Sequence, residues 1–395
     1  MTFSARVPGH LEPNLLSTAL QSLKQQGRPF LDLTLSNPTH AGFDYPADLL
    51  APLANHRGLD YAPEPLGLKA ARAAVAGDFA RRGLTVSPDR IALTASTSEA
   101  YSLAFKLLCD PHDEVLVPRP SYPLFEHLTR LDSVEAVPYV LEQHGRWSLD
   151  LASIEHAISP RARALLLVNP NNPTGSFVSQ GEIDALAALC RSAGVAVIAD
   201  EVFADYELTP GAASRAGHLV DRTDVLGFTL GGLSKSVGLP QVKLGWMALS
   251  GDDTLVGEAI ERLELIADTY LSVSTPVQEG LPDLFERGAS LRRQIQVRVQ
   301  ANFAALASRA VRTRSCRVLP ADGGWYAILQ VPSVVDEETL VLELLKTEGV
   351  LVHPGYFFDF SRESYLVVSL IPPEAVFADA VDRVLRRFDR LDEDQ

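Results

Sequence analysis

The sequence predicts an α/β protein in which short apolar strands alternate with helices around a mostly parallel sheet. The runs Ala164–Val168 and Val195–Ala199 are continuously apolar, as expected of strands that are buried on both faces. Helical patterns separate such runs over residues 46–286. This alternation favours parallel pairing, because parallel strands need a crossover that a helix commonly provides.

The other elements are predicted from the same patterns, in chain order. Residues 11–26 carry apolar side chains at helical spacing and end at Gly27, and Phe30–Leu35 alternates like a strand. The segment Tyr61–Gly67 is expected to open a helix that runs to about Arg82. Further strands are expected at 91–94, 114–118 and 365–370, and further helices up to Leu108 and over roughly 252–269, 276–286, 290–309, 336–348 and 374–388.

Composition limits the classes of function. A hydrophobic fraction of 46% and a charged fraction of 22% are those of a soluble globular protein. The formal net charge of −15 argues against nucleic acid or an anionic membrane as a partner. The N-terminus resembles no signal peptide, and no apolar stretch reaches the roughly 20 residues that span a bilayer. A cytoplasmic protein is expected.

The three cysteines indicate neither a disulfide framework nor a metal site. Cys109, Cys190 and Cys316 are far apart, and no CxxC pair occurs. Cys109 and Cys190 fall in helical apolar patterns, which is typical of small core residues.

Polar residues follow several of the expected strands. Asp200 ends an apolar strand, where a carboxylate is costly unless it is paired, although it could also cap a helix. The turn Asn169–Gly175 lies at the carboxyl end of another strand, the edge at which open α/β sheets bind ligands. The segment Ala95–Ala100 joins a strand to a helix start, which suits a phosphate group but is also an ordinary serine cap.

Lys235 lies between two apolar runs, Val225–Leu230 and Leu244–Leu249. Burial lowers the pKa of a lysine and makes its amine a nucleophile that can form a Schiff base with an aldehyde. A solvated lysine in a surface loop is the alternative for such a residue taken alone.

Two motifs resemble those of a known family. The segment Ser234–Trp246, with its Ser-Lys-x-x-Gly-Leu-Pro start, resembles the lysine motif of class I/II aminotransferases, which use pyridoxal 5′-phosphate (PLP). The turn Asn169–Gly175 is similar to the family's Asn-Pro-x-Asn-Pro-Thr-Gly motif, and the resemblance covers nearly the whole chain.

The resemblance implies a fold, a reaction and partners. It implies PLP fold type I, with a large PLP-binding domain at 46–286 and a smaller α+β domain formed by 1–45 and 287–395. It also implies a homodimer and an aminotransferase that moves an amino group from a small-molecule amino donor to a keto acid in a ping-pong cycle.

The same resemblance assigns roles to residues around the cofactor. Lys235 would form the Schiff base and move the α-proton, Asp200 would hold the pyridine nitrogen, and Asn172 the ring oxygen. Tyr122 would stack on the ring. The residues expected to hold the phosphate are Thr97, Ser98, Ser234, Lys243 and, across the dimer interface, Tyr61.

The chain departs from the family pattern at several positions. Lys243 replaces the usual arginine and lacks its planar bidentate fork. Phe203 replaces a tyrosine that donates to the ring oxygen in relatives, and Ser36 replaces a glycine near the substrate. Val367 occupies the position of the arginine that clamps the substrate's carboxylate. Either the substrate lacks that carboxylate, or another cation such as Arg362 or Arg6 replaces the clamp.

Two other functions remain open from sequence. A PLP-dependent lyase, decarboxylase or oxidase would share these motifs, because the motifs position the cofactor without deciding which bond breaks. A non-enzymatic effector-binding domain of a bacterial regulator is the second, but only about 45 residues precede the large domain, and the chain is acidic.

Overall fold

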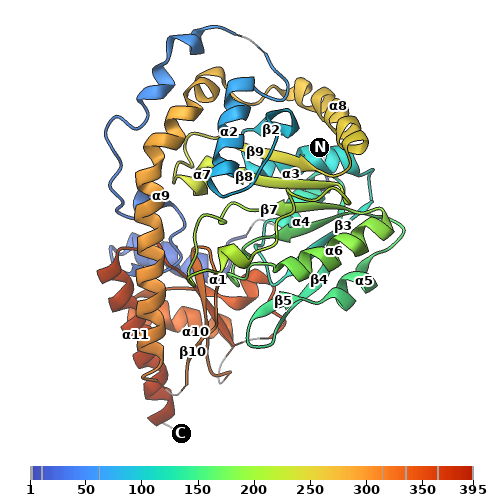
Figure 1. The fold of residues 1–395 in the computed structure, drawn as a ribbon. Helices are drawn as coiled ribbons and strands as arrows, with labels where there is room; N and C mark the ends of the chain where they lie inside the picture. The colour runs from blue at the N-terminus through green and yellow to red at the C-terminus, as the bar shows by residue number, and fades with distance from the viewer. Residues whose placement is uncertain are drawn as a thin grey trace.

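The computed structural model describes residues 3–9, 12–61, 63–313, 315–333, 336–362 and 364–393. Its centre is an eight-stranded sheet in the order β2-β9-β8-β7-β6-β3-β4-β5 (Figure 1). The five strands from β8 to β4 run parallel, whereas β9 pairs antiparallel with β2 and β8, and β5 pairs antiparallel with β4. The strands are β2 (Ile91–Thr94), β3 (Glu114–Arg119), β4 (Glu135–Gln143), β5 (Trp147–Leu149), β6 (Ala162–Val168), β7 (Ala196–Asp200), β8 (Gly227–Gly232) and β9 (Gly245–Ser250). The predicted α/β class with a mostly parallel sheet is confirmed.

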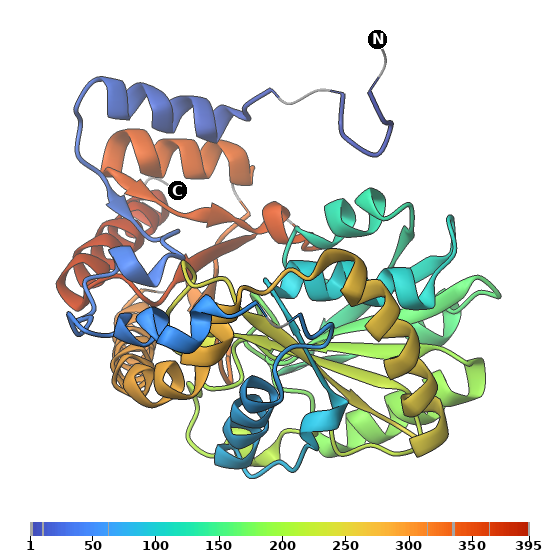
Figure 2. The same cartoon turned by 90° about the horizontal axis from the view of Figure 1, so that it is seen from above.

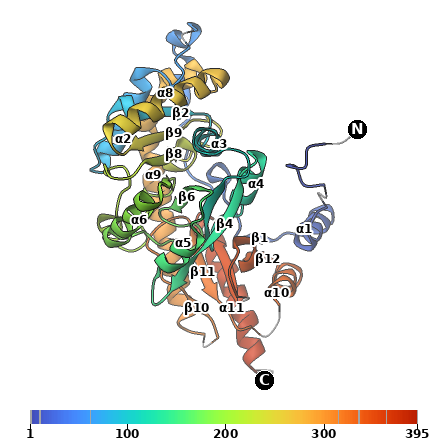
Figure 3. The ribbon, with the colours of Figure 1, turned by 90° about the vertical axis from the view of Figure 1, so that its right-hand side faces the viewer.

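Helices cover both faces of this sheet. The helices α3 (Thr97–Leu108) and α4 (Phe125–Leu131) lie on one face, and α5 (Leu151–Ala157) and α6 (Gln180–Ala193) lie on the other (Figure 3). The helix α8 (Asp253–Tyr270) packs beside α3 and contributes to the same core. Successive residues of β6 join different cores, since Leu165 contributes to the core under α6 and Leu166 to the core under α3. A strand with apolar cores on both sides must be apolar throughout, which is the pattern seen in the sequence.

A second group of elements combines the two ends of the chain. The helix α1 (Leu15–Gln25) lies beside α10 (Glu337–Glu343), as Figure 2 shows. A four-stranded antiparallel sheet has the order β10-β11-β14-β13, and β1 pairs parallel with β12. The strands of this group are β1 (Leu31–Asp32), β10 (Arg317–Val318), β11 (Tyr326–Gln330), β12 (Val350–Leu351), β13 (His353–Pro354) and β14 (Tyr365–Ser369), and its closing helix is α11 (Glu374–Glu393).

The two helices expected at 276–286 and 290–309 are one continuous helix, α9 (Thr275–Ala310), which passes through Pro282 and Gly288. The expectation of two separate helices was wrong. A Cβ atom at Gly288 would lie 2.7 Å from the side chain of Val237, so glycine is required for close packing against the segment after Lys235. The division into domains at 46 and 286 stays a proposal, and α9 runs through its second boundary.

Other boundaries differ modestly from expectation. The helix α2 (Lys69–Arg81) begins after Gly67 rather than at Tyr61. Gly67 has φ +94°, a conformation that ends the preceding loop and that residues with side chains rarely adopt. The helix expected at 336–348 is α10 followed by one wider π turn, Leu344–Glu348.

Candidate active site

A cavity of about 200 Å³ lies at the carboxyl edge of the large sheet, against the smaller sheet. Residues from the ends of β6 and β7, the start of α3 and the segment after β8 line it, together with Tyr326 of β11. Eight of the predicted site residues line this single cavity: Thr97, Ser98, Tyr122, Asn172, Asp200, Phe203, Ser234 and Lys235.

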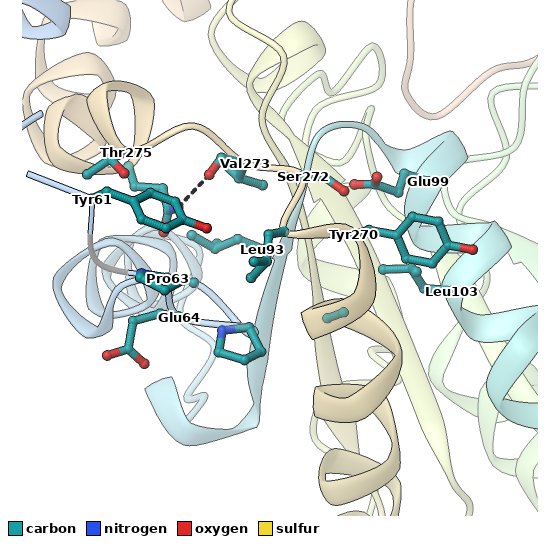
Figure 4. A pocket seen from close by; sticks show the side chains of 15 residues that line it. Tyr61, Pro63, Glu64, Leu93, Glu99, Leu103, Tyr270, Ser272, Val273 and Thr275 are labelled. Carbon is teal, nitrogen blue, oxygen red and sulfur yellow. Dashed lines mark hydrogen bonds between the residues drawn. The ribbon is translucent and has the colours of Figure 1, made fainter. Parts of the chain in front are cut away.

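Two predicted residues lie elsewhere. Lys243 is exposed and does not line the cavity. Tyr61 is 76% exposed and lines a different pocket, where Figure 4 shows it and Tyr270 on opposite sides of Leu93.

Lys235 follows β8 in the one-turn helix α7 (Leu233–Ser236) and extends its amine between two aromatic rings. Its Nζ lies 4.8 Å from the ring centroid of Trp325 and 5.6 Å from that of Phe203. Burial lowers the pKa of Lys235 to about 8, and the charge of Asp200 opposes part of that shift. At pH 7 roughly a tenth of this amine is therefore unprotonated and nucleophilic, far more than for an ordinary lysine.

The backbone that carries Lys235 is held by three side chains from different parts of the chain. The hydroxyl of Tyr206 donates to the carbonyl of Lys235, Arg292 Nε donates to the carbonyl of Ser236 (2.9 Å), and Tyr45 donates to Gly238 (2.6 Å). The lysine is thus fixed through its main chain.

Behind this segment lies a buried ion-pair cluster. Arg292 contacts Asp78 at 3.0 Å and Asp205 at 3.5 Å, and Arg81 pairs with the same two carboxylates. Buried charges of this kind are tolerated because each has a partner. The cluster joins α2, α9 and the loop after β7 beneath Lys235.

Asp200 ends β7 with both carboxylate oxygens engaged. Its Oδ1 accepts from the backbone N–H of Val202 (3.1 Å), and its Oδ2 accepts from the hydroxyl of Tyr101 (3.0 Å). Burial raises the pKa of Asp200 to about 6, against the effect of these hydrogen bonds and of Lys235. The carboxylate is therefore mostly ionised at pH 7 and suited to pair with a cation in the cavity.

The start of α3 presents backbone N–H groups beside the cavity. Ser96 is the N-cap, and its hydroxyl accepts from the N–H of Glu99. The first-turn N–H groups at Thr97 and Ser98 have no partner within the helix and can bind an anion. A Cβ atom at Gly245 would lie 3.1 Å from the nitrogen of Thr97, so glycine lets β9 approach this helix start.

Asn172 has an unsatisfied group at the cavity. Its Oδ1 is buried, and no hydrogen-bond partner is found for it among the described residues. A buried polar atom without a partner is costly, so the amide of Asn172 is expected to bind a ligand group. This amide, the ionised Asp200, the amine of Lys235 and the α3 N-terminus together fit a phosphorylated pyridine aldehyde.

The remaining wall of the cavity is neutral. Leu124, Phe125 and Leu128 line it from α4 and its approach, and a hydrogen bond joins the hydroxyls of Ser36 and Tyr326. Among the lining residues, Asp200 and Lys235 are the charged ones.

Neither of the two arginines considered as replacements for the carboxylate clamp places its charge in the cavity. Val367 is fully buried in β14 and does not line the cavity, although it shares a sheet face with Tyr326 and Ser369. Arg362 is exposed, and Arg6 donates to the carbonyl of Leu131; neither lines the cavity.

Sequence reasoning missed Tyr101 and Tyr326. Tyr101 lies one helical turn after Thr97, so helical spacing from the expected phosphate-binding residues could have placed it on the cavity side. Tyr326 comes from a distant strand, and no local pattern placed it in the site.

Comparison with known proteins identifies the family. The model of class I and II aminotransferases matches residues 36–384. The chain belongs to the class I and II aminotransferases. Members of this family use PLP, so the chain is a PLP-dependent transferase of amino groups, acting between an amino donor and a keto acid.

The similarity to curated aminotransferases extends over nearly the whole chain. It is 28% identical over 381 residues to the glutamate–pyruvate aminotransferase AlaA of Escherichia coli K12, which covers 93% of this chain and 92% of that protein. It is also 28% identical over 375 residues to the alanine aminotransferase of Mycobacterium tuberculosis H37Rv, with 92% and 86% covered.

Solved aminotransferase structures share the fold. An alanine aminotransferase from Pyrococcus furiosus superposes with a TM-score of 0.85 at 23% identity, covering 95% of this chain and 96% of that one. A mutant aspartate aminotransferase from Thermus thermophilus gives 0.83 at 23% identity, covering 98% and 99%. Among the helices described here, none is both long and apolar enough to cross a membrane.

Proposed function

We propose that this aminotransferase works by a ping-pong cycle on an amino donor whose carboxylate, if it has one, is not held by the usual arginine. The observation that carries the proposal is the cavity itself, in which the Lys235 amine and the Asp200 carboxylate lie among neutral and apolar side chains. A pocket of this kind selects by shape and apolar contact more than by charge.

The residues fit PLP in the following way. Asp200 would hold the ring nitrogen, the amide of Asn172 would contact the ring oxygen, and Tyr122 would stack on the ring. The helix start at Thr97 and Ser98, with Ser234, would hold the phosphate, and Lys243 and Tyr61 would complete that site. When bound, the cofactor supplies an aldehyde that binds amines and a ring that accepts electrons from the substrate.

Lys235 would both bind the cofactor and move the substrate's α-proton. A base must be unprotonated to accept a proton and must hold it loosely enough to return it, which favours a pKa near the operating pH. The pKa of about 8 at Lys235 meets that condition, whereas an ordinary lysine would not.

The substrate end of the cavity supports an uncommon donor. Removing the charged partner of a desolvated carboxylate typically costs about 2–5 kcal/mol of binding free energy. In place of that partner, Ser36, Tyr326 and Asn172 offer neutral hydrogen bonds. We infer that aspartate, glutamate and alanine are poor donors and that a specialised amine or modified amino acid is preferred. Curated relatives are named glutamate–pyruvate and alanine aminotransferases, so glutamate and alanine are the first donors to test.

We further propose a homodimer in which Tyr61 reaches the phosphate of the other subunit. Leu59, Tyr61 and Tyr270 are 87%, 76% and 53% exposed. Large apolar side chains gathered on one surface mark interaction sites. Tyr61 also lies outside the cavity of its own chain, as a residue that serves a neighbour would.

A single-turnover screen tests the proposal. The cofactor-loaded protein is mixed with a panel of amino acids and amines without acceptor, and loss of the cofactor's visible absorbance is followed together with release of the keto product. A common amino acid that saturates at micromolar concentration, with Arg362→Ala and Arg6→Ala unchanged, would contradict the neutral substrate site. Borohydride labelling of a lysine other than Lys235 would contradict the catalytic assignment.

A further inference from the structure

Tyr101 contacts the carboxylate of Asp200 from a different element. Its hydroxyl, on α3, donates to Oδ2 at 3.0 Å, while the backbone N–H of Val202 donates to Oδ1 at 3.1 Å. The carboxylate is thus held at both oxygens, one by a residue far earlier in the chain and one by a residue just after it. Only the tyrosine bond depends on a side chain.

The hydroxyl of Tyr101 is held in place by packing. Tyr101 is 2% exposed, and its ring lies 5.5 Å from Phe125 edge to face and 6.1 Å from Phe105. Aromatic neighbours on two sides fix the ring, and α3 fixes its Cα. The hydroxyl cannot turn to solvent, so the packing keeps it directed at Asp200.

The pKa values of Asp200 and Tyr101 show which of the two carries the proton of this hydrogen bond. Burial raises the pKa of Asp200 to about 6; the hydrogen bonds from Val202 and Tyr101 oppose the shift, as does the charge of Lys235, whereas the charge of Glu201 adds to it. Burial and the charge of Asp200 raise the pKa of Tyr101 itself well above its usual value. Tyr101 therefore stays protonated and remains a donor at any ordinary pH, as does Tyr122, whose pKa is raised too.

We propose that Tyr101 is a positioning residue that keeps Asp200 ionised and oriented toward the cofactor's ring nitrogen. This rests on the role proposed above for Asp200. A carboxylate that accepts a hydrogen bond is a weaker base, so the proton shared between the ring nitrogen and Asp200 stays on the nitrogen. Tyr101 thereby supports the protonated ring without touching the substrate.

The test is Tyr101→Phe, with cofactor labelled with nitrogen-15 at the ring and bound to the apoprotein. Without the donor, Asp200 is more basic, and the nitrogen-15 resonance should move toward the value of a neutral pyridine. The dissociation constant of the cofactor should rise roughly ten- to a hundredfold, the range for a hydrogen bond to a charged group. Nitrogen-15 and affinity values equal to wild type would overturn the proposal.

The matched control is Tyr139→Phe, which also removes a buried hydroxyl but one that donates to the carbonyl of Leu166 at 2.8 Å. It should leave the nitrogen-15 resonance unchanged; an equal shift would show a general effect of lost packing and would overturn the assignment. If Tyr101→Phe fails to fold, a fluorinated tyrosine at position 101 donates a stronger bond and should leave the nitrogen at least as protonated, with tighter cofactor binding. A shift toward neutral pyridine there would count against the proposal.

Asp200→Ala separates this inference from the function on which it rests. It should lose the protonated-nitrogen resonance and most of the cofactor affinity. If Asp200→Ala resembles wild type, the role of Asp200 is wrong. If Asp200→Ala is severely impaired while Tyr101→Phe is not, the role of Tyr101 alone fails.

Discussion

The hydroxyl of Tyr206 donates a hydrogen bond to the main-chain carbonyl of Lys235, so the residue with the reactive amine is held by its backbone as well as by the walls around its side chain. Tyr206 is fully buried and packs edge to face on Trp325, whose ring also lies beside the lysine amine. One aromatic pair therefore contacts both ends of Lys235.

Tyr206→Phe should lower the free energy of unfolding by about 0.5–1.5 kcal/mol, because the carbonyl of Lys235 loses one of its donors and keeps the N–H of Gly238. It should also slow formation of the covalent lysine–cofactor adduct, measured by stopped-flow absorbance on the apoprotein. Tyr139→Phe is the control, with a similar stability loss and an unchanged rate. Equal rates in both variants would show that this bond does not hold the lysine.

The stability of the apoprotein should depend on the charge of Lys235. Its pKa is about 8 when folded and about 10.4 when unfolded, so the unfolded chain binds more protons between these values and stability rises with pH there. At pH 7 both states are mostly protonated, and the buried charge costs about 3 kcal/mol.

Lys235→Met should therefore be more stable than wild type at pH 7, and the difference should shrink between pH 8 and pH 10.5. Urea unfolding of both apoproteins across this pH range measures it. A difference that does not change with pH would mean that the amine is solvated.

Gly245→Ala should weaken cofactor binding. The added Cβ would lie 3.0–3.1 Å from the backbone around Ser96 and Thr97, and buried backbone has little freedom to move away. Titration of the apoprotein with PLP should show a dissociation constant raised roughly tenfold or more, the equivalent of about 1.4 kcal/mol.

Gly257→Ala in α8 is the control, because a Cβ there would meet no atom within 4 Å. It should leave binding unchanged and stabilise the helix by up to about 1 kcal/mol. Wild-type affinity in Gly245→Ala would show that the start of α3 can shift without affecting the phosphate.

Phe203→Tyr should lower the pKa at which the bound cofactor's visible band changes. Phe203 is 5% exposed and lies beside Lys235 and Trp325, and a phenol at its edge could donate to the ring oxygen and favour its ionised form. A spectroscopic pH titration of both proteins gives the shift. An unchanged or raised pKa would mean that another group already donates there.

Mixing inactive subunits tests the shared site. If Tyr61 serves the other subunit, a hybrid dimer of Lys235→Ala and Tyr61→Ala chains contains one complete site, with Lys235 from one chain and Tyr61 from the other. Activity should reappear after the two variants are mixed and allowed to exchange subunits. Light scattering gives the mass of each, and a monomeric wild type or a hybrid without recovery would contradict the arrangement.

Sequence could predict the part of the site that depends on local motifs. Asp200 ends an apolar strand, and Asn172 and Lys235 come a few residues after the ends of two others. Because the carboxyl ends of neighbouring parallel strands meet at one edge, their convergence follows from the pattern. The sheet was predictable for the same reason, since strands buried on both faces leave a continuous apolar signal.

The remainder depends on contacts between distant segments. Tyr101 reads as one more apolar residue of α3, and its bond to Asp200 depends on the packing of that helix on β8 and β9, beside β7. The gap expected between helices 276–286 and 290–309 contains Gly288, which lies inside α9 and packs closely against Val237 from a distant part of the chain. Lys243 and Tyr61 matched the family by order in the chain, yet neither lines the cavity in this chain by itself.

The unbroken α9 contacts both parts of the molecule that meet at the cavity. Arg292 bonds to the carbonyl of Ser236, next to Lys235, and ten residues further along Asn302 bonds to the carbonyls of Leu370 and Pro372, just beyond β14. Residues 292 and 302 lie about 15 Å apart along one continuous helix. A rotation of the C-terminal sheet that keeps the bonds of Asn302 would therefore move α9 with it and strain the bond from Arg292 to Ser236, so movement of that sheet is coupled to the position of Lys235.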